Sequence, residues 1–103
     1  METDNTEEGV EWYRKSAEQG FLLAIVCLAG LYYKGEKVAQ DYAEAVKWLQ
    51  ISAASGISDA QYKLGLCYLN GQGVKKSRHK GLKLIRMAAE QGYEEARKTL
   101  MQS

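Results

Sequence analysis

Apolar side chains recur along this chain at helical spacing. Ala24, Leu28, Leu31 and Tyr32 fall at positions i, i+4, i+7 and i+8, which places them on one face of an amphipathic helix. The same periodicity, broken by polar residues and glycines, predicts helices at about 7–19, 21–34, 42–55, 59–70, 78–91 and 93–102. Consecutive helices joined by short turns form antiparallel hairpins, so the pattern predicts an all-α protein.

Polar residues mark where several of these helices begin. Asp41 with Glu44, and Ser58 with Gln61, have the spacing of a capping box. Ser77 has the position of an N-cap for the helix over 78–91. We therefore expect all three side chains to bond to the first turn of a helix.

The pattern repeats every 36 residues. This step links Gly20, Gly56 and Gly92, and likewise Trp12 and Trp48. It also links Ala17, Ala53 and Ala89; Ala24, Ala60 and Ala96; and Leu28, Leu64 and Leu100. We predict a single domain, 1–103, divided into a half repeat (6–20), two repeats (21–56 and 57–92) and a closing half repeat (93–103). The fold class expected is a short right-handed α/α solenoid of stacked helix hairpins.

The repeated residues resemble the Sel1-like repeats, relatives of the tetratricopeptide repeat, over about 9–100. They are Asp41, Ala45, Trp48, Ala53, Ala54 and Gly56, followed by Ala60, Leu64, Gly65, Tyr68, Gly71, Gly73 and Val74. In the last repeat Ser77, Gly81 and Leu84 stand where the family has aspartate, alanine and tryptophan, and Gly81 is expected to cost its helix ~1 kcal/mol relative to alanine. The resemblance implies a solenoid whose concave face is lined by the first helix of each hairpin.

Composition indicates an ordered globular protein and narrows the function classes. Of 103 residues, 46% are hydrophobic and 26% charged, and the net charge is +1, so no overall field attracts nucleic acid or an anionic membrane. The longest mostly apolar run, 19–33, is shorter than a membrane-spanning helix requires. The acidic N-terminus lacks the pattern of a signal peptide, and we expect a cytoplasmic protein.

Residues that could perform chemistry are few. His79 is the single histidine and lies among lysines and arginines, whose charges oppose a metal ion. Cys27 and Cys67 each lie in an apolar helix, where cysteine acts as a small hydrophobic side chain. We therefore expect no enzyme activity, no metal and no cofactor.

The segment 21–33 carries no charge and is apolar on all sides, unlike an ordinary surface helix. By analogy with tetratricopeptide domains, the residues expected on the concave face are Val26, Gly30, Tyr33, Lys34, Tyr62, Leu66, Leu69, Asn70, Lys98 and Met101. An open groove of this composition would bind a protein partner. Two alternatives stay open: an internal core covered by the helix that carries Trp12 and Tyr13, or the seam of a homodimer.

A basic edge is the second candidate surface. It consists of Lys75, Lys76, Arg78, Lys80, Lys83 and Arg86. No aromatic residue lies between 69 and 92, so a solvated face or a contact for an acidic protein is favoured here over binding to RNA or DNA. The sequence thus predicts a non-enzymatic protein–protein interaction module: a small adaptor, an inhibitor or a toxin-neutralising immunity protein. A structural homo-oligomer and an enzyme of unknown reaction are the alternatives.

Overall fold

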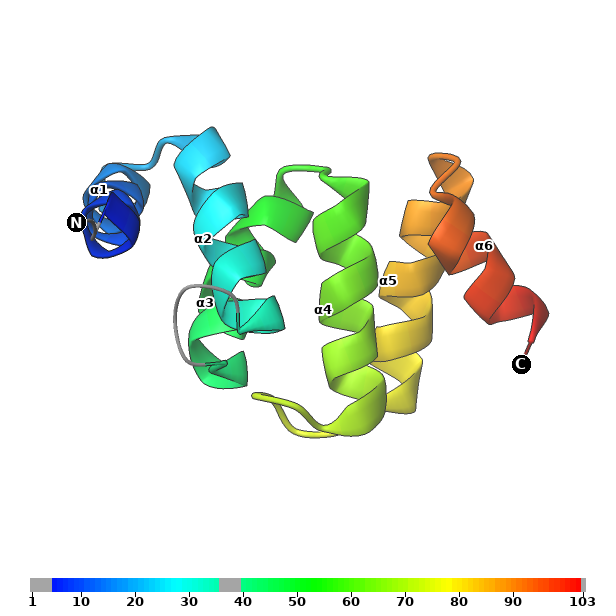
Figure 1. Cartoon of the computed structure of the whole chain (residues 1–103). Helices are drawn as coiled ribbons and strands as arrows, with labels where there is room; N and C mark the ends of the chain where they lie inside the picture. The colour runs from blue at the N-terminus through cyan, green and yellow to red at the C-terminus, as the bar shows by residue number, and fades with distance from the viewer. Residues whose placement is uncertain (1–4, 36–39, 103) are drawn as a thin grey trace.

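The protein is a row of α-helices. The computed structural model describes residues 5–35 and 40–102, which form six helices and no strand. The helices are α1 (Asn5–Glu18), α2 (Leu22–Lys34), α3 (Tyr42–Ala54), α4 (Ser58–Asn70), α5 (Arg78–Glu90) and α6 (Glu94–Met101), as Figure 1 shows. Each boundary lies within two residues of its predicted position, and the all-α prediction is confirmed. None of the helices described has the length and hydrophobicity that crossing a membrane requires.

Helix positions and turn geometry recur along the chain. Helices α2, α4 and α6 begin 36 residues apart, as do α3 and α5. The turns before α2, α4 and α6 contain Gly20, Gly56 and Gly92, with φ of 92°, 92° and 90°. Glycine adopts this left-handed backbone without the penalty that a Cβ imposes. The exact division into repeats 21–56 and 57–92 stays a prediction.

The predicted caps of α3 and α5 are present as single hydrogen bonds. Asp41 Oδ1 accepts from the backbone N–H of Glu44, and Ser77 Oγ accepts from that of Lys80, each at 3.2 Å. The backbone N–H of Asp41 donates to the carbonyl of Tyr32 at 3.1 Å, so it is not available for the second bond of a capping box. The backbone N–H of Ser77 likewise donates to the carbonyl of Tyr68 at 2.8 Å, so both capping residues join the loop before their helix to the preceding helix.

The predicted cap of α4 is wrong. Ser58 is the first residue of the helix, and the capping position belongs to Ile57, which makes no side-chain cap hydrogen bond. The expected partner Gln61 is buried, and its Nε2 donates to the carbonyl of Ala53 in the preceding helix at 3.2 Å. Gln61 therefore joins α4 to α3 instead of completing a box.

Each helix packs against the next, which gives a solenoid of 47 × 22 × 22 Å with its termini at opposite ends (Figure 1). The larger core cluster is formed by α1 to α4. A second cluster consists of Ile85, Ala88 and Ala96 from α5 and α6, and Tyr62, Leu66 and Leu69 of α4 pack against it. Helix α4 thus covers the pair formed by α5 and α6.

Helices α4 and α5 cross at a pair of glycines. A Cβ added to Gly81 would lie 2.8 Å from the carbonyl oxygen of Gly65 and 2.8 Å from Leu69 Cδ2. The corresponding positions of α2 and α3, 36 residues earlier, hold Ala29 and Ala45, which are also buried. Gly81 therefore allows a backbone approach that an alanine would obstruct.

Candidate functional site

A groove of about 310 Å³ lies between α2 and α4. We call it the concave groove; its lining is Tyr13, Val26, Cys27, Gly30, Leu31, Lys34, Asp59 and Lys63. Val26, Gly30 and Lys34 belong to the face predicted from the sequence. Asp59 and Lys63 were missed, although their spacing of four residues puts them on one side of a helix.

Small side chains in α2 leave this groove open. Val26 and Gly30 stand 36 residues before Tyr62 and Leu66, which are larger and pack against the core cluster of α5 and α6. The space that is filled beside α4 is therefore left open beside α2. An added Cβ at Gly30 would meet no atom within 4 Å.

An ion pair forms the polar wall of the concave groove. Lys63 Nζ lies 3.0 Å from Asp59 Oδ2, and the hydroxyl of Tyr93 donates to Asp59 Oδ1 at 2.6 Å. Burial raises the pKa of Asp59, but the bonds from Tyr93 and Lys63 and the charges of Lys63 and Lys34 outweigh it and hold the pKa below its ordinary value. Asp59 is thus ionised at neutral pH and partly neutralised by its neighbours.

Two tyrosines of the predicted concave face support its structure. The ring of Tyr33 lies under Lys63 Nζ, 5.5 Å from the centroid, and makes an edge contact with Tyr42. Its burial is the main reason that its pKa is raised to about 12. The hydroxyl of Tyr62 shares a hydrogen bond of 3.0 Å with Thr99. Both rings are half-buried, and neither lines the concave groove.

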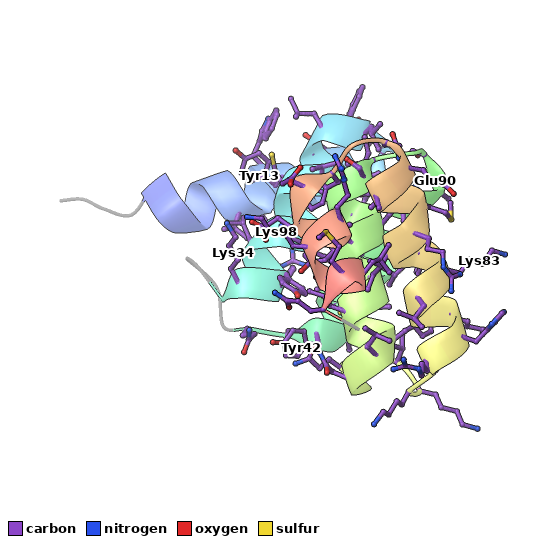
Figure 2. All side chains as sticks on the ribbon, turned by 90° about the vertical axis from the view of Figure 1, so that its right-hand side faces the viewer. Tyr13, Lys34, Tyr42, Lys83, Glu90 and Lys98 are labelled. Carbon is purple, nitrogen blue, oxygen red and sulfur yellow. The ribbon has the colours of Figure 1, made fainter. Side chains whose placement is uncertain are left out.

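The remaining predicted concave residues divide between core and solvent. Leu66 and Leu69 are half-buried against the cluster of α5 and α6. Asn70, Lys98 and Met101 are exposed. Figure 2 shows Lys98 on the same side of the molecule as Tyr13 and Lys34, with Lys83 and Glu90 on the opposite side. Neither Lys98 nor Met101 lines the concave groove.

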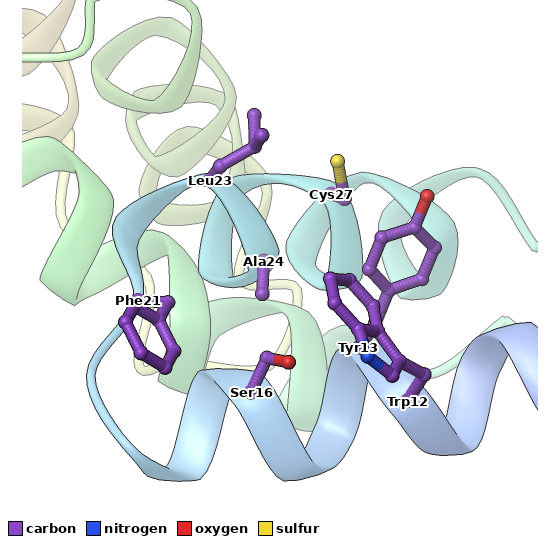
Figure 3. Close-up of a pocket in the computed structure, with 7 residues that line it drawn as sticks. All are labelled: Trp12, Tyr13, Ser16, Phe21, Leu23, Ala24 and Cys27. Atoms are coloured by element: carbon purple, nitrogen blue, oxygen red, sulfur yellow. The ribbon is translucent and has the colours of Figure 1, made fainter.

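A second, apolar groove of about 460 Å³ lies at the N-terminal end of the solenoid (Figure 3). We call it the end groove; it is lined by Trp12, Tyr13, Ser16, Phe21, Leu23, Ala24 and Cys27. The exposed fractions of Trp12, Phe21 and Leu23 are 62%, 60% and 77%. Phe21 and Leu23 were missed as surface residues, because the segment 21–33 is apolar throughout.

The segment 21–33 has a buried face and an open one. Its buried residues are Ala24, Ile25, Leu28, Ala29 and Tyr32. Val26, Cys27, Gly30, Leu31 and Tyr33 are half-buried, and Phe21, Leu22 and Leu23 are exposed. The hydrophobicity of this helix therefore serves the internal core on one side and supplies two grooves on the other.

The six cations of the basic edge are all exposed, in the loop before α5 and along that helix. Lys75, Lys76 and Lys80 border a pocket of about 450 Å³ with Tyr68 of α4, and Lys80 Nζ lies 5.6 Å from the centre of that ring. The sequence interpretation missed Tyr68 because it comes from the preceding helix.

Side chains that could act as metal ligands or nucleophiles are dispersed. Within residues 5–35 and 40–102, no three His, Cys, Asp or Glu side chains gather as metal ligands would. His79 is exposed. Cys67 is fully buried, and this burial raises the pKa of its thiol to about 11, whereas Cys27 is half-buried at the border of both grooves.

Known proteins resemble this chain in both sequence and fold. The family model of the Sel1 repeat matches residues 2–21, 23–57 and 58–93. A solved Sel1 repeat protein from Oxalobacter formigenes is 35% identical, with a TM-score of 0.83 over 94% of this chain and 73% of that one. A protective antigen present in uropathogenic Escherichia coli strains, displaying an SLR fold, is 42% identical, with a TM-score of 0.79 over 86% of this chain. The match covers 19% of that antigen, so the chain spans about a fifth of its length. No curated protein matches the chain.

Proposed function

Because this chain belongs to the Sel1 repeat family, whose members are generally protein-interaction modules, we propose that it binds a partner protein through the concave groove. The observation that carries the proposal is the opening beside α2, where Val26 and Gly30 leave unfilled the space that Tyr62 and Leu66 occupy one repeat later.

The lining of the groove favours a particular kind of partner segment. Val26, Gly30 and Leu31 provide an apolar floor, which receives an apolar anchor side chain. Lys34 is exposed at the rim, so an acidic residue beside the anchor gains a charge-assisted contact. Asp59 is already paired with Lys63 and adds little net charge. The partner segment expected is a short helix or extended strand with an apolar anchor next to a carboxylate.

The role that follows is that of a small binding protein. We propose that the chain acts as an adaptor, an inhibitor or an immunity protein that neutralises a toxin. We propose no catalytic step. A structural homo-oligomer is the competing function, and the cytoplasmic location stays a prediction.

Filling the groove tests this function directly. Gly30→Leu places in α2 the residue type that α4 has at Leu66, and no neighbouring atom obstructs the new Cβ. The variant should fold, and its capture of the native partner from a lysate of the source organism should fall at least about tenfold, because an anchor side chain is excluded. Lys83→Glu, on the opposite side of the molecule, is the matched control and should leave capture unchanged (Figure 2).

Photo-crosslinking identifies the surface in contact. A benzophenone amino acid in place of Val26 should join the captured protein, while the same group in place of Lys83 should not. Crosslinking from position 83 alone would assign binding to the basic edge. Crosslinking from position 26 to a second copy of this chain would establish the homo-oligomer instead.

A further inference from the structure

The end groove exposes positions that the rest of the solenoid buries. Trp12 is 62% exposed, whereas Trp48, 36 residues later, is 4% exposed. Helix α3 lies between α2 and α4, while α1 packs against α2. The groove between α1 and α2 therefore presents an uncovered version of a surface that is covered in the next repeat.

The structure shows what covers such a surface. In the last hairpin, Ile85, Ala88 and Ala96 stand 72 residues after Tyr13, Ser16 and Ala24 of the end groove. Tyr62, Leu66 and Leu69 of α4 pack on them, at positions i, i+4 and i+7 of one helix. A helix with three apolar side chains at this spacing is thus the natural occupant.

The end groove is also more apolar than its counterparts. Leu23 and Cys27 stand where α4 has the ion pair Asp59–Lys63. With Trp12 and Phe21, they add exposed apolar area, whose removal from water favours binding. The face of the occupant that contacts this groove must therefore be apolar.

In a second copy of this chain, helix α6 does not present the matching apolar face. The positions that correspond to Tyr62 and Leu66 hold Lys98 of α6 and Gln102, the C-cap of that helix, and both are polar and exposed. Met101, 84% exposed, stands where α4 has Gly65 at its close crossing with α5. Helix α6 is therefore unsuited to covering the end groove of a neighbour.

We propose that the end groove binds an amphipathic α-helix of a partner protein, which lies on α1 and α2 as α4 lies on α5 and α6. The helix carries apolar residues at i, i+4 and i+7 and has about the length of α4, 13 residues. This surface is separate from the concave groove, and Tyr13 and Cys27 form the border between them.

The chain's own covering helix is the probe for this site. A fluorescently labelled, helix-stapled peptide of residues 57–71, with Cys67→Ser, is titrated into the full-length protein and followed by anisotropy. The control peptide carries Tyr62→Ala, Leu66→Ala and Leu69→Ala. The first peptide should bind saturably and slow the alkylation of Cys27, and the control should bind at least about tenfold more weakly.

Variants of the protein locate the binding. Leu23→Asp introduces the residue type that the next repeat has at Asp59, so the fold tolerates it, and peptide affinity should fall at least about tenfold because a charge enters an apolar contact. Met101→Asp, at the opposite end, should leave the affinity unchanged. Urea unfolding confirms that both variants fold.

Three results overturn the proposal. These are no saturable binding, equal binding of the two peptides, and binding that Leu23→Asp leaves intact. A homodimer that light scattering detects and that Leu23→Asp dissolves would assign the groove to self-association. Because Gly30→Leu acts at the concave groove and Leu23→Asp at the end groove, failure of one proposal is distinguishable from failure of the other.

Discussion

Replacing Gly81 by alanine sets helix propensity against packing at the crossing of α4 and α5. Propensity alone favours the variant by about 1 kcal/mol. Packing opposes it, because the new Cβ would lie 2.8 Å from the carbonyl oxygen of Gly65 and 2.8 Å from Leu69 Cδ2. Overpacking costs about 1–3 kcal/mol, and the upper part of that range applies because a backbone atom cannot move aside as a side chain does. The expected net loss is about 1–2 kcal/mol of the free energy of unfolding.

Urea unfolding followed by circular dichroism measures this loss. The midpoint should fall with an unchanged m-value, because the surface exposed on unfolding is the same. Gly30→Ala is the matched control: its added Cβ meets no atom within 4 Å, so it should stabilise the protein by up to about 1 kcal/mol. If Gly81→Ala stabilises as much as Gly30→Ala, propensity governs both positions and the argument from the close crossing is refuted.

Three further measurements test other parts of the structure. Because the folded-state pKa of Asp59 is lowered, its contribution to stability is complete above its ordinary pKa of about 4 and is lost as the pH falls through the lowered value. Asp59→Asn should therefore flatten the decline of the urea midpoint in that acidic range. An unchanged decline would contradict this assignment. Alkylation at pH 8 should modify Cys27 much faster than the buried Cys67, and equal rates in the folded protein would refute the burial. Asp41→Ala should lower the free energy of unfolding, measured in urea, by about 1 kcal/mol and Ser58→Ala by less than about 0.5 kcal/mol, because only Asp41 is a cap. Equal losses would support the capping box predicted for Ser58 at the start of α4.

The fold could be predicted because its signals are local and repeated. The 36-residue step brings Gly20, Gly56 and Gly92 to equivalent turns, and Asp41 and Ser77 to equivalent helix starts. Each of these residues acts through its own backbone or that of a residue three positions away. Local chemistry of this kind is readable from sequence alone.

The errors arise where a side chain is used by a distant helix. Ser58 and Gln61 have the spacing of a capping box, but Gln61 accepts a hydrogen bond of 2.9 Å from Gln91, 30 residues away. Gly81 was expected only to weaken its helix, yet it permits close contact with Gly65. Neither use is visible without knowing which helices are neighbours.

The candidate sites could be predicted only in part, because they too combine residues from helices that are distant in the sequence. The analogy with tetratricopeptide domains placed Val26, Gly30 and Lys34 on one face, and they line the concave groove. The groove also requires Asp59 and Lys63 from the next hairpin, and its depth depends on which repeat has the smaller side chains. The exposure of the end groove depends on whether a helix packs on α1 and α2, and periodicity does not encode this.

Side-chain hydrogen bonds between the last two hairpins distribute stability unevenly along the solenoid. Tyr93 binds Asp59, Gln91 binds Gln61, and Tyr62 binds Thr99, each joining residues at least 30 positions apart. Repeat proteins open locally, and hydrogen bonds between helices slow that opening. Amide hydrogens of α1 and α2 should therefore exchange with solvent sooner than those of α4 and α5. Since the end groove is built on α1 and α2 and the concave groove also uses α4, a partner in the end groove would slow exchange mainly in α1 and α2, whereas one in the concave groove would also slow it in α4.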